Sequence, residues 1–246
     1  MEQIPLPPAP SFTDSFVNVF ATPGDAFQGL KNTAPAPMLW IIPFIVTILV
    51  TIGSMFIIHN NETLSAEARE LQSKMIQKMV NEGKLPADKA EAAEQQADSP
   101  FARAMQFVGG AIVCALFYFG GALFLWLANK AVLKTTAGYE KHLELYSIAS
   151  WTGILGGIIT IGMMIGVGSL NASPSAALVV LGNYDGTLIL HKLLSAINIF
   201  SLWQTLVIGI GLSKFSDKPV GQGFAVAFVL WLLWVAFTLG LSIIFQ

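Results

Sequence analysis

Five long runs of apolar residues constrain this chain more than any other feature. No charged residue lies in the middle of any run, and each is long enough for a helix to cross the ~30 Å hydrocarbon core of a bilayer. A segment in lipid must satisfy its own backbone polar groups, and the runs lack the alternation of barrel strands. We therefore predict an all-α integral membrane protein, a bundle of five transmembrane helices, with spans near 38–58, 104–129, 145–170, 189–212 and 224–245.

Charged residues are scarce, and half of them lie in one segment. They make up 11% of the chain, against about 25% in a typical soluble domain. Of the 28 Lys, Arg, Asp and Glu residues, 14 fall between Glu62 and Arg103. A soluble domain could not cover its surface with so few polar groups, so the lipid bilayer is the expected surrounding. The net charge of −2 argues against nucleic acid as a partner.

Residues 1–37 precede the first span and are predicted to form an extended, proline-rich lead followed by short amphipathic helices. Ser11 and Asp14 have the spacing of a helix-capping box. We interpret these helices as lying in the membrane interface, although their aromatic residues could instead pack back onto the spans as core. The candidates for interfacial or partner contact are Phe12, Phe16, Phe20 and, before the third span, Tyr139.

The rest of the chain, 38–246, is predicted to be one five-span membrane domain with a polar insertion at 62–103. Apolar residues recur at helical spacing from Leu64 to Met79. Gly83 can end that helix, and Pro86 can begin another. We predict an extramembrane helical hairpin between spans 1 and 2. Its charges fit a solvated face, and a partner site is the alternative.

The spans offer neutral polar groups and glycines, and we expect both to pack helices together. No Asp, Glu or Arg is expected inside a span. Asn198 shares a helical face with Ser201 and Thr205, and in lipid such groups usually bond between helices. The alternative is that they line a polar cavity. Glycines at GxxxG spacing allow close packing within one chain or, alternatively, in a homo-oligomer; those of the third run are Gly153, Gly157, Gly162 and Gly166.

The sequence lacks the residue patterns of the common catalytic and cofactor sites. The single cysteine, Cys114, allows no intrachain disulfide. The three histidines do not pair at metal-ligand spacing, and there is no HExxH, CxxC, GxSxG or phosphate-binding loop. We therefore expect a protein that is not an enzyme, with no catalytic residues, no metal and no cofactor.

The lysines of the short loops predict the orientation in the membrane. Loop 130–144 carries three lysines and loop 213–222 carries two, whereas 171–188 carries none. Positively charged loops tend to stay on the cytoplasmic side. We therefore expect the N-terminus inside, and the hairpin and the C-terminus outside.

Three segments carry a resemblance to a known family. Residues 19–27 read VFATPGDAF, the loop 136–140 leads into 145–150, and 203–213 precedes a short basic loop and a final span. In this order they resemble the Yip-domain (Ypt/Rab-interacting-protein) family, prokaryotic branch. The resemblance implies a five-helix bundle in the prokaryotic cytoplasmic (inner) membrane, with a cytosolic N-terminus and no known catalytic residues. Eukaryotic members bind Rab-type GTPases, but the chain shows no match to their Asp-Leu-Tyr-Gly-Pro motif.

Two classes of function follow from these observations. The first is a non-enzymatic membrane scaffold or accessory protein that contacts other membrane proteins, for example in an export or envelope-associated complex. The lack of charge in the spans, the glycine faces and the hairpin favour it. The second is a small-solute transporter or channel, which only the neutral polar face of the fourth span favours.

Overall fold

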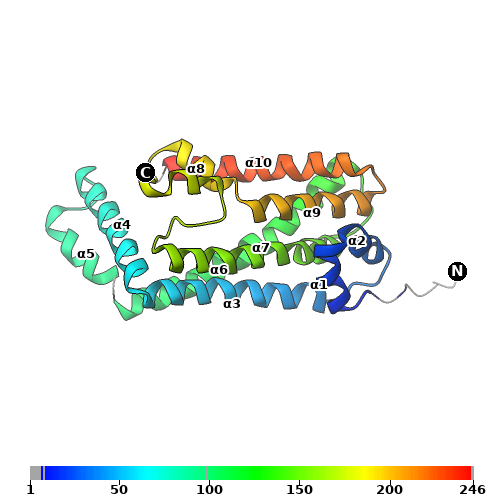
Figure 1. Cartoon of the computed structure of the whole chain (residues 1–246), viewed down its shortest axis with the longest axis horizontal. Helices are drawn as coiled ribbons and strands as arrows, with labels where there is room; N and C mark the ends of the chain where they lie inside the picture. The colour runs from blue at the N-terminus through cyan, green and yellow to red at the C-terminus, as the bar shows by residue number, and fades with distance from the viewer. Residues whose placement is uncertain (1–6, 8, 98, 245–246) are drawn as a thin grey trace.

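The computed structural model describes residues 7, 9–97 and 99–244 of the chain (Figure 1). Most of the predicted proline-rich lead and the last residue of the fifth predicted run, Phe245, lie outside these residues. The α-helices are α1 (Phe12–Ala21), α2 (Pro23–Lys31), α3 (Met38–Asn60), α4 (Glu62–Asn81), α5 (Ala90–Ala97), α6 (Pro100–Ala128), α7 (Tyr139–Val167), α8 (Ile189–Ala196), α9 (Ile199–Ser216) and α10 (Val220–Ile244). Shorter helical segments are η1 (Ala87–Lys89), η2 (Asn129–Leu133) and η3 (Ala176–Asn183).

Five helical segments are long and apolar enough to cross a membrane, which confirms the predicted all-α bundle. They are Met38–Asn60, Pro100–Leu133, Tyr139–Val167, Ile199–Ser216 and Val220–Ser242. They run side by side, and the polar insertion forms the helices α4 and α5 beyond one end of the bundle (Figure 1). We call this the hairpin end, and the opposite end, where α1 and α2 pack, the α1–α2 end.

Local sequence signals begin and end these helices. The Ser11 hydroxyl accepts a hydrogen bond from Asp14 N at 3.1 Å, and the Asn61 side chain accepts one from Leu64 N at 3.0 Å. Ser99 caps α6 in the same way, before a proline in the first turn. Gly168 ends α7 with φ = 73°, a conformation that glycine adopts without the steric cost of a Cβ.

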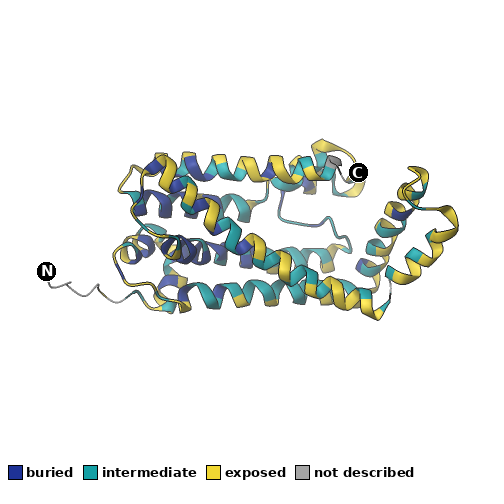
Figure 2. Cartoon of the chain, turned by 180° about the vertical axis from the view of Figure 1, so that it is seen from behind, coloured by how far each residue is buried: buried dark blue, intermediate teal, exposed yellow. Residues whose placement is uncertain are grey.

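The most deeply buried residues gather at the α1–α2 end, as Figure 2 shows. Phe27 and Leu30 of α2 pack with Leu145 of α7 and with Leu212 and Phe215 of α9. Elsewhere the spans leave large apolar side chains exposed on the outside of the bundle, as a surface in contact with lipid requires. The core that positions the helices is therefore concentrated at one end.

The third span starts earlier than predicted, and the expectation that no acidic residue lies within a span is wrong. The predicted run begins at Leu145, but α7 begins at Tyr139 and includes Lys141 and Glu144. The reason is that Lys141 and Glu144 pair with each other (2.8 Å) and are covered by the α1–α2 end, so the helix extends through a charged segment.

The fourth predicted span is not one continuous helix. The run 189–212 is divided into α8 and α9 by a break at Ile197 and Asn198. The segment between α7 and α8 folds back against this break (Figure 1). Ala176 N donates to Ile197 O at 3.0 Å, and Ile199 N donates to Pro174 O at 3.1 Å. The break persists because this returning segment satisfies backbone groups that a helix would otherwise pair.

Candidate functional site

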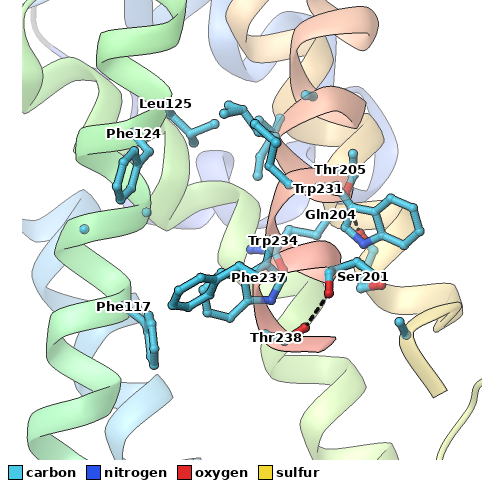
Figure 3. Close-up of a pocket in the computed structure, with 18 of the residues that line it drawn as sticks. Phe117, Phe124, Leu125, Ser201, Gln204, Thr205, Trp231, Trp234, Phe237 and Thr238 are labelled. Carbon is cyan, nitrogen blue, oxygen red and sulfur yellow. Dashed lines mark hydrogen bonds between the residues drawn. The ribbon is translucent and has the colours of Figure 1, made fainter. Parts of the chain in front are cut away.

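A cavity of about 880 Å³ lies between α6 on one side and α8, α9 and α10 on the other, and we call it the lateral groove (Figure 3). Its rim includes Phe117, Phe124 and Phe237, which are 47%, 66% and 51% exposed. The groove therefore opens on the outer surface of the bundle, where lipid would lie. Trp231 and Trp234 of α10 form part of its wall (Figure 3).

The polar side of the lateral groove comes from α9, which contributes Ser201, Gln204 and Thr205. The two hydroxyls donate to carbonyls of the preceding turn: Ser201 to Asn198 O at 3.0 Å, and Thr205 to Ser201 O at 2.8 Å. The predicted polar face of the fourth span thus lines a cavity, which was the alternative to bonding between helices.

A second, smaller cavity of about 220 Å³ lies among α3, α6, α7 and α9, and we call it the inner pocket. Tyr146 of α7 and Gln204 of α9 line both this pocket and the lateral groove. The other polar lining residues of the inner pocket are Thr47, Thr51, Tyr118 and Ser150. Since the described lining of both cavities carries no charged side chain, the site suits neutral groups.

Two glycines leave room for the shared polar side chains. A Cβ at Gly153 would lie 2.8 Å from Gln204 Oε1, and a Cβ at Gly121 would lie 3.1 Å from the Tyr146 hydroxyl. Any larger residue at either position would have to push the polar side chain aside. Neither glycine is therefore replaceable without disturbing the junction of the two cavities.

A buried ion pair lies at the α1–α2 end. Lys141 Nζ donates to Glu144 Oε2 at 2.8 Å, to Thr33 Oγ1 at 3.1 Å and to Ala34 O at 3.1 Å. Glu144 Oε1 accepts from Ala36 N at 2.5 Å. Each charge therefore has hydrogen-bond partners in the linker between α2 and α3, and the pair fixes that linker on α7.

A buried histidine continues this polar region. His142 Nδ1 lies 2.9 Å from Gly138 O, so Nδ1 carries the proton and Nε2 accepts from Asn129 Nδ2, also at 2.9 Å. Asn129 Oδ1 in turn accepts from Ser216 Oγ at 2.7 Å. These bonds join η2, α7 and the end of α9. Both nitrogens of the imidazole therefore have hydrogen-bond partners. In the described part of the chain, no three His, Cys, Asp or Glu side chains gather to hold a metal.

The four glycines singled out from the sequence differ in their surroundings. A Cβ would meet tight contact at Gly153 and ordinary contact at Gly157, where Val50 Cγ1 is 3.4 Å away. At Gly162 and Gly166 it would meet nothing within 4 Å, so these two are not close-packing positions in the chain. The GxxxG spacing missed Gly156, where a Cβ would lie 2.6 Å from Phe200 Cβ.

Asn198 does not bond across helices, so its prediction as a helix-packing residue needs correction. It is the N-cap of α9, and its side-chain oxygen accepts from Phe200 N at 2.9 Å. Because the break in the fourth span occurs at Asn198, its side chain serves the backbone of its own helix. The asparagine could have indicated that a helix starts here, because Asn is a preferred N-cap residue.

The aromatic candidates at the α1–α2 end contact the spans. Phe12 and Phe16 pack edge-on against Trp151 of α7, with centroid distances of 5.8 and 4.9 Å, and Phe20 packs against Trp203 of α9 at 5.5 Å. These contacts agree with the alternative prediction, in which the aromatic residues of the N-terminal helices pack back onto the spans as core. The Tyr139 hydroxyl donates to Phe119 O at 3.2 Å.

A bundle of five helices that are each long and apolar enough to cross a membrane defines a polytopic integral membrane protein. The sequence matches the Yip1 domain family over residues 17–242. The chain therefore belongs to the Yip1 domain family, as its motifs predicted. Neither the curated proteins nor the solved structures that were compared with it gave a match.

The three family-like segments come together at the α1–α2 end. Val19 and Phe27 from the first, Leu145 and Ile148 from the second, and Val207 from the third belong to one buried cluster. The motifs therefore specify the packing of this end, and the second and third segments also contribute Tyr146, Gln204 and Thr205 to the lining of the lateral groove.

Proposed function

We propose that the protein is a non-enzymatic membrane scaffold or accessory protein, and that the hairpin of α4 and α5 binds another membrane protein. The observation that carries this proposal is an apolar stripe on α4 that nothing in the described chain covers. Leu71, Met75 and Met79 are 46%, 65% and 44% exposed and lie at i, i+4 and i+8 on one face. Methionine side chains adapt readily to a partner surface.

The hairpin is held in a defined position, so the stripe is presented in a fixed direction. Glu67 of α4 accepts hydrogen bonds from Leu170 N at 2.7 Å and from Asn171 Nδ2 at 3.2 Å, in the segment that follows α7. Within the hairpin, Ser73 of α4 donates to Glu94 of α5 at 2.7 Å. A surface attached at several points loses less conformational entropy when it binds.

The charge around the stripe favours a protein over a lipid surface. Segment 62–103 has eight acidic and six basic residues, an excess of acid that does not suit anionic lipid headgroups. Beside the stripe, Lys74 Nζ lies 2.6 Å from Glu70 Oε1; this hydrogen bond lowers the pKa of Glu70 and raises that of Lys74, so it favours the charged form of each. An amphipathic helix of the partner, with apolar residues at similar spacing, fits such a surface.

The experiment compares complexes extracted from native membranes in mild detergent. The wild type should migrate in a complex with one stoichiometric partner. The variant Leu71→Gln/Met75→Gln/Met79→Gln should migrate as the free chain and keep the melting temperature of the wild type. The control Glu70→Gln/Lys74→Gln changes the charged flank of the same helix and should retain the complex. A wild type that migrates without a partner would refute the proposal.

The discontinuous fourth span favours small-solute transport as a second candidate. Transporters often build their substrate sites at breaks in transmembrane helices, and Ser195, Ala196 and Asn198 at this break line the lateral groove. Flux of uncharged solutes into liposomes containing the purified protein, reduced in Gln204→Leu without loss of melting temperature, would favour this candidate. The scaffold proposal expects no flux above protein-free liposomes.

The location is part of the proposal. The short-loop lysines support a cytoplasmic membrane with the α1–α2 end inside and the hairpin outside. The proposed partner is therefore expected to have a helix on the outer side of that membrane.

A further inference from the structure

The lateral groove has the dimensions of a ligand site. Its volume of about 880 Å³ falls in the range of about 300–1,000 Å³ that is usual for small-molecule pockets. α6 crosses the bundle obliquely, so it separates from α10 along part of its length (Figure 2). The opening between these two helices faces the surface on which lipid would lie, so a ligand could enter from the bilayer.

Two polar groups at the inner wall of the groove lack partners. The Gln204 amide and the Tyr146 hydroxyl make no hydrogen bond to any described residue of the chain. Leaving such groups unpaired in a water-poor cavity is unfavourable. Both side chains lie where the groove meets the inner pocket, and Gly153 and Gly121 leave the space that they occupy. Two polar side chains that face one cavity can together bind the polar group of a ligand.

The position of these groups along their helices indicates their depth in the bilayer. Tyr146 lies seven residues into α7, about 10 Å from its start, and Gln204 lies twelve residues before the end of α9, about 18 Å from it. Both of these helix ends belong to the α1–α2 end. With these helix ends at the boundary of a ~30 Å hydrocarbon core, the two groups would lie about 10–18 Å inside it.

The lining restricts the chemistry of the ligand. An ionic headgroup would lose its water without gaining a counter-charge, because no charged side chain lines the described part of either cavity. Gln204 and Tyr146 can each both donate and accept a hydrogen bond, so a head with a hydroxyl and neighbouring carbonyls would satisfy them. The remaining wall is apolar and aromatic, with Phe117, Phe124 and Trp234 leading outward (Figure 3). This wall suits hydrocarbon chains.

We propose that the lateral groove binds a neutral glycerolipid of the diacylglycerol type, with its hydroxyl and ester carbonyls at Gln204 and Tyr146 and its acyl chains between α6 and α10. Such a lipid is uncharged, so its head can enter the bilayer interior at lower cost than a phospholipid head. The site is separate from the hairpin surface proposed to bind a protein partner.

The test uses the full chain in nanodiscs with a diacylglycerol that carries a photoreactive group on one acyl chain. We expect labelled peptides from α6 and α10, and competition by unlabelled diacylglycerol. The variant Gln204→Leu/Tyr146→Phe should reduce labelling, by about two- to tenfold for each hydrogen bond lost. Melting temperatures separate loss of the site from loss of folding.

A matched pair of glycine-to-leucine variants on α6 tests the position of the acyl chains. A Cβ at Gly120, which lines the groove, or at Gly109, which does not, would meet nothing within 4 Å. Gly120→Leu should therefore fold and block labelling, whereas Gly109→Leu should fold and leave it unchanged. Equal labelling of the two variants would overturn the proposed position.

Competition experiments test the chemistry of the head. Phosphatidylglycerol with the same acyl chains should compete at least tenfold less well than diacylglycerol. Equal competition by this anionic lipid would overturn the assignment of an uncharged head. Stronger competition by an isoprenoid quinone than by diacylglycerol would overturn the assignment to a glycerolipid.

Discussion

Lys141 and Glu144 lie in the interior of the α1–α2 end, where their side chains are only 9% and 1% exposed. Charged groups are stable there only when the opposite charge and further hydrogen bonds replace water. Thr33, Ala34 and Ala36 provide those bonds from the linker between α2 and α3. At the scale of single residues, the pair therefore determines where the N-terminal helices join the bundle.

Glu144→Gln should destabilise the protein by about 3–5 kcal/mol, because it leaves the Lys141 charge buried without its partner. The free energy of unfolding in mixed detergent measures this effect. Glu140→Gln, at an exposed position four residues earlier, is the control and should change stability by less than about 0.5 kcal/mol. Lys141→Met/Glu144→Met should recover most of the loss. If Glu144→Gln were as stable as Glu140→Gln, the pair would not hold the linker.

At the scale of helices, the closest packing is between α9 and α10. A Cβ at Gly223 would overlap Ser213 Oγ and the carbonyl oxygen of Gly209, and the second of these is backbone that cannot rotate away. The Ser213 hydroxyl also donates to Gly209 O, at 2.9 Å. The two helices therefore approach closely because small residues meet there. This contact joins neighbouring spans of one chain and does not use the predicted GxxxG glycines.

Gly223→Ala should destabilise the bundle by about 1–3 kcal/mol, because the added methyl group forces the two helices apart. Gly162→Ala, at a position with no neighbour within 4 Å, should be neutral or stabilising by up to about 1 kcal/mol, since alanine favours the helix. Unfolding free energies of the two variants check this difference. Equal destabilisation would mean that Gly162 packs against a second chain in the membrane.

At the scale of the whole molecule, the two ends of the bundle differ in construction. The α1–α2 end contains the main core and the buried polar contacts, and the Lys31–Asp217 ion pair links α2 to the turn after α9. The hairpin end carries α4, α5 and the segment that returns to the break between α8 and α9 (Figure 1). The orientation of the bundle in the membrane therefore decides which end faces the cytoplasm. A cytoplasmic partner can reach only that end, and an external partner only the other.

An impermeant thiol reagent should label Gln95→Cys but not Thr136→Cys in intact cells, in a Cys114→Ser background. The reason is that the lysines of the short loops favour the α1–α2 end inside. Both positions are exposed, whereas the neighbouring Thr135 is buried and would not react for structural reasons. Labelling of position 136 alone would reverse the orientation. Labelling of both after permeabilisation is the positive control.

Five spans, the membrane class and the polar insertion could be predicted because each depends on the composition of one continuous segment. A run such as Met38–Ile58 must be helical in lipid whatever its neighbours are. The family was also predictable, since the motif residues Val19, Phe27 and Leu145 occur at recognisable spacing. Their clustering in one core could not be predicted, because it depends on contacts between distant segments.

The candidate site was predictable only in part. The polar face of the fourth span was visible in the sequence, yet only the packing of α6 away from α10 turns it into one wall of a groove. The start of α7 at Tyr139 could not be predicted, because hydropathy averages over a window and cannot reveal that Glu144 pairs with Lys141. Likewise, the break at Asn198 lies in an apolar run, and it exists because the distant Pro174 and Ala176 bond to its backbone. The sequence by itself thus determined what must lie in lipid, through local hydrophobicity. Only the tertiary structure decided which polar groups are satisfied and which face a cavity, because that depends on neighbours far away along the chain.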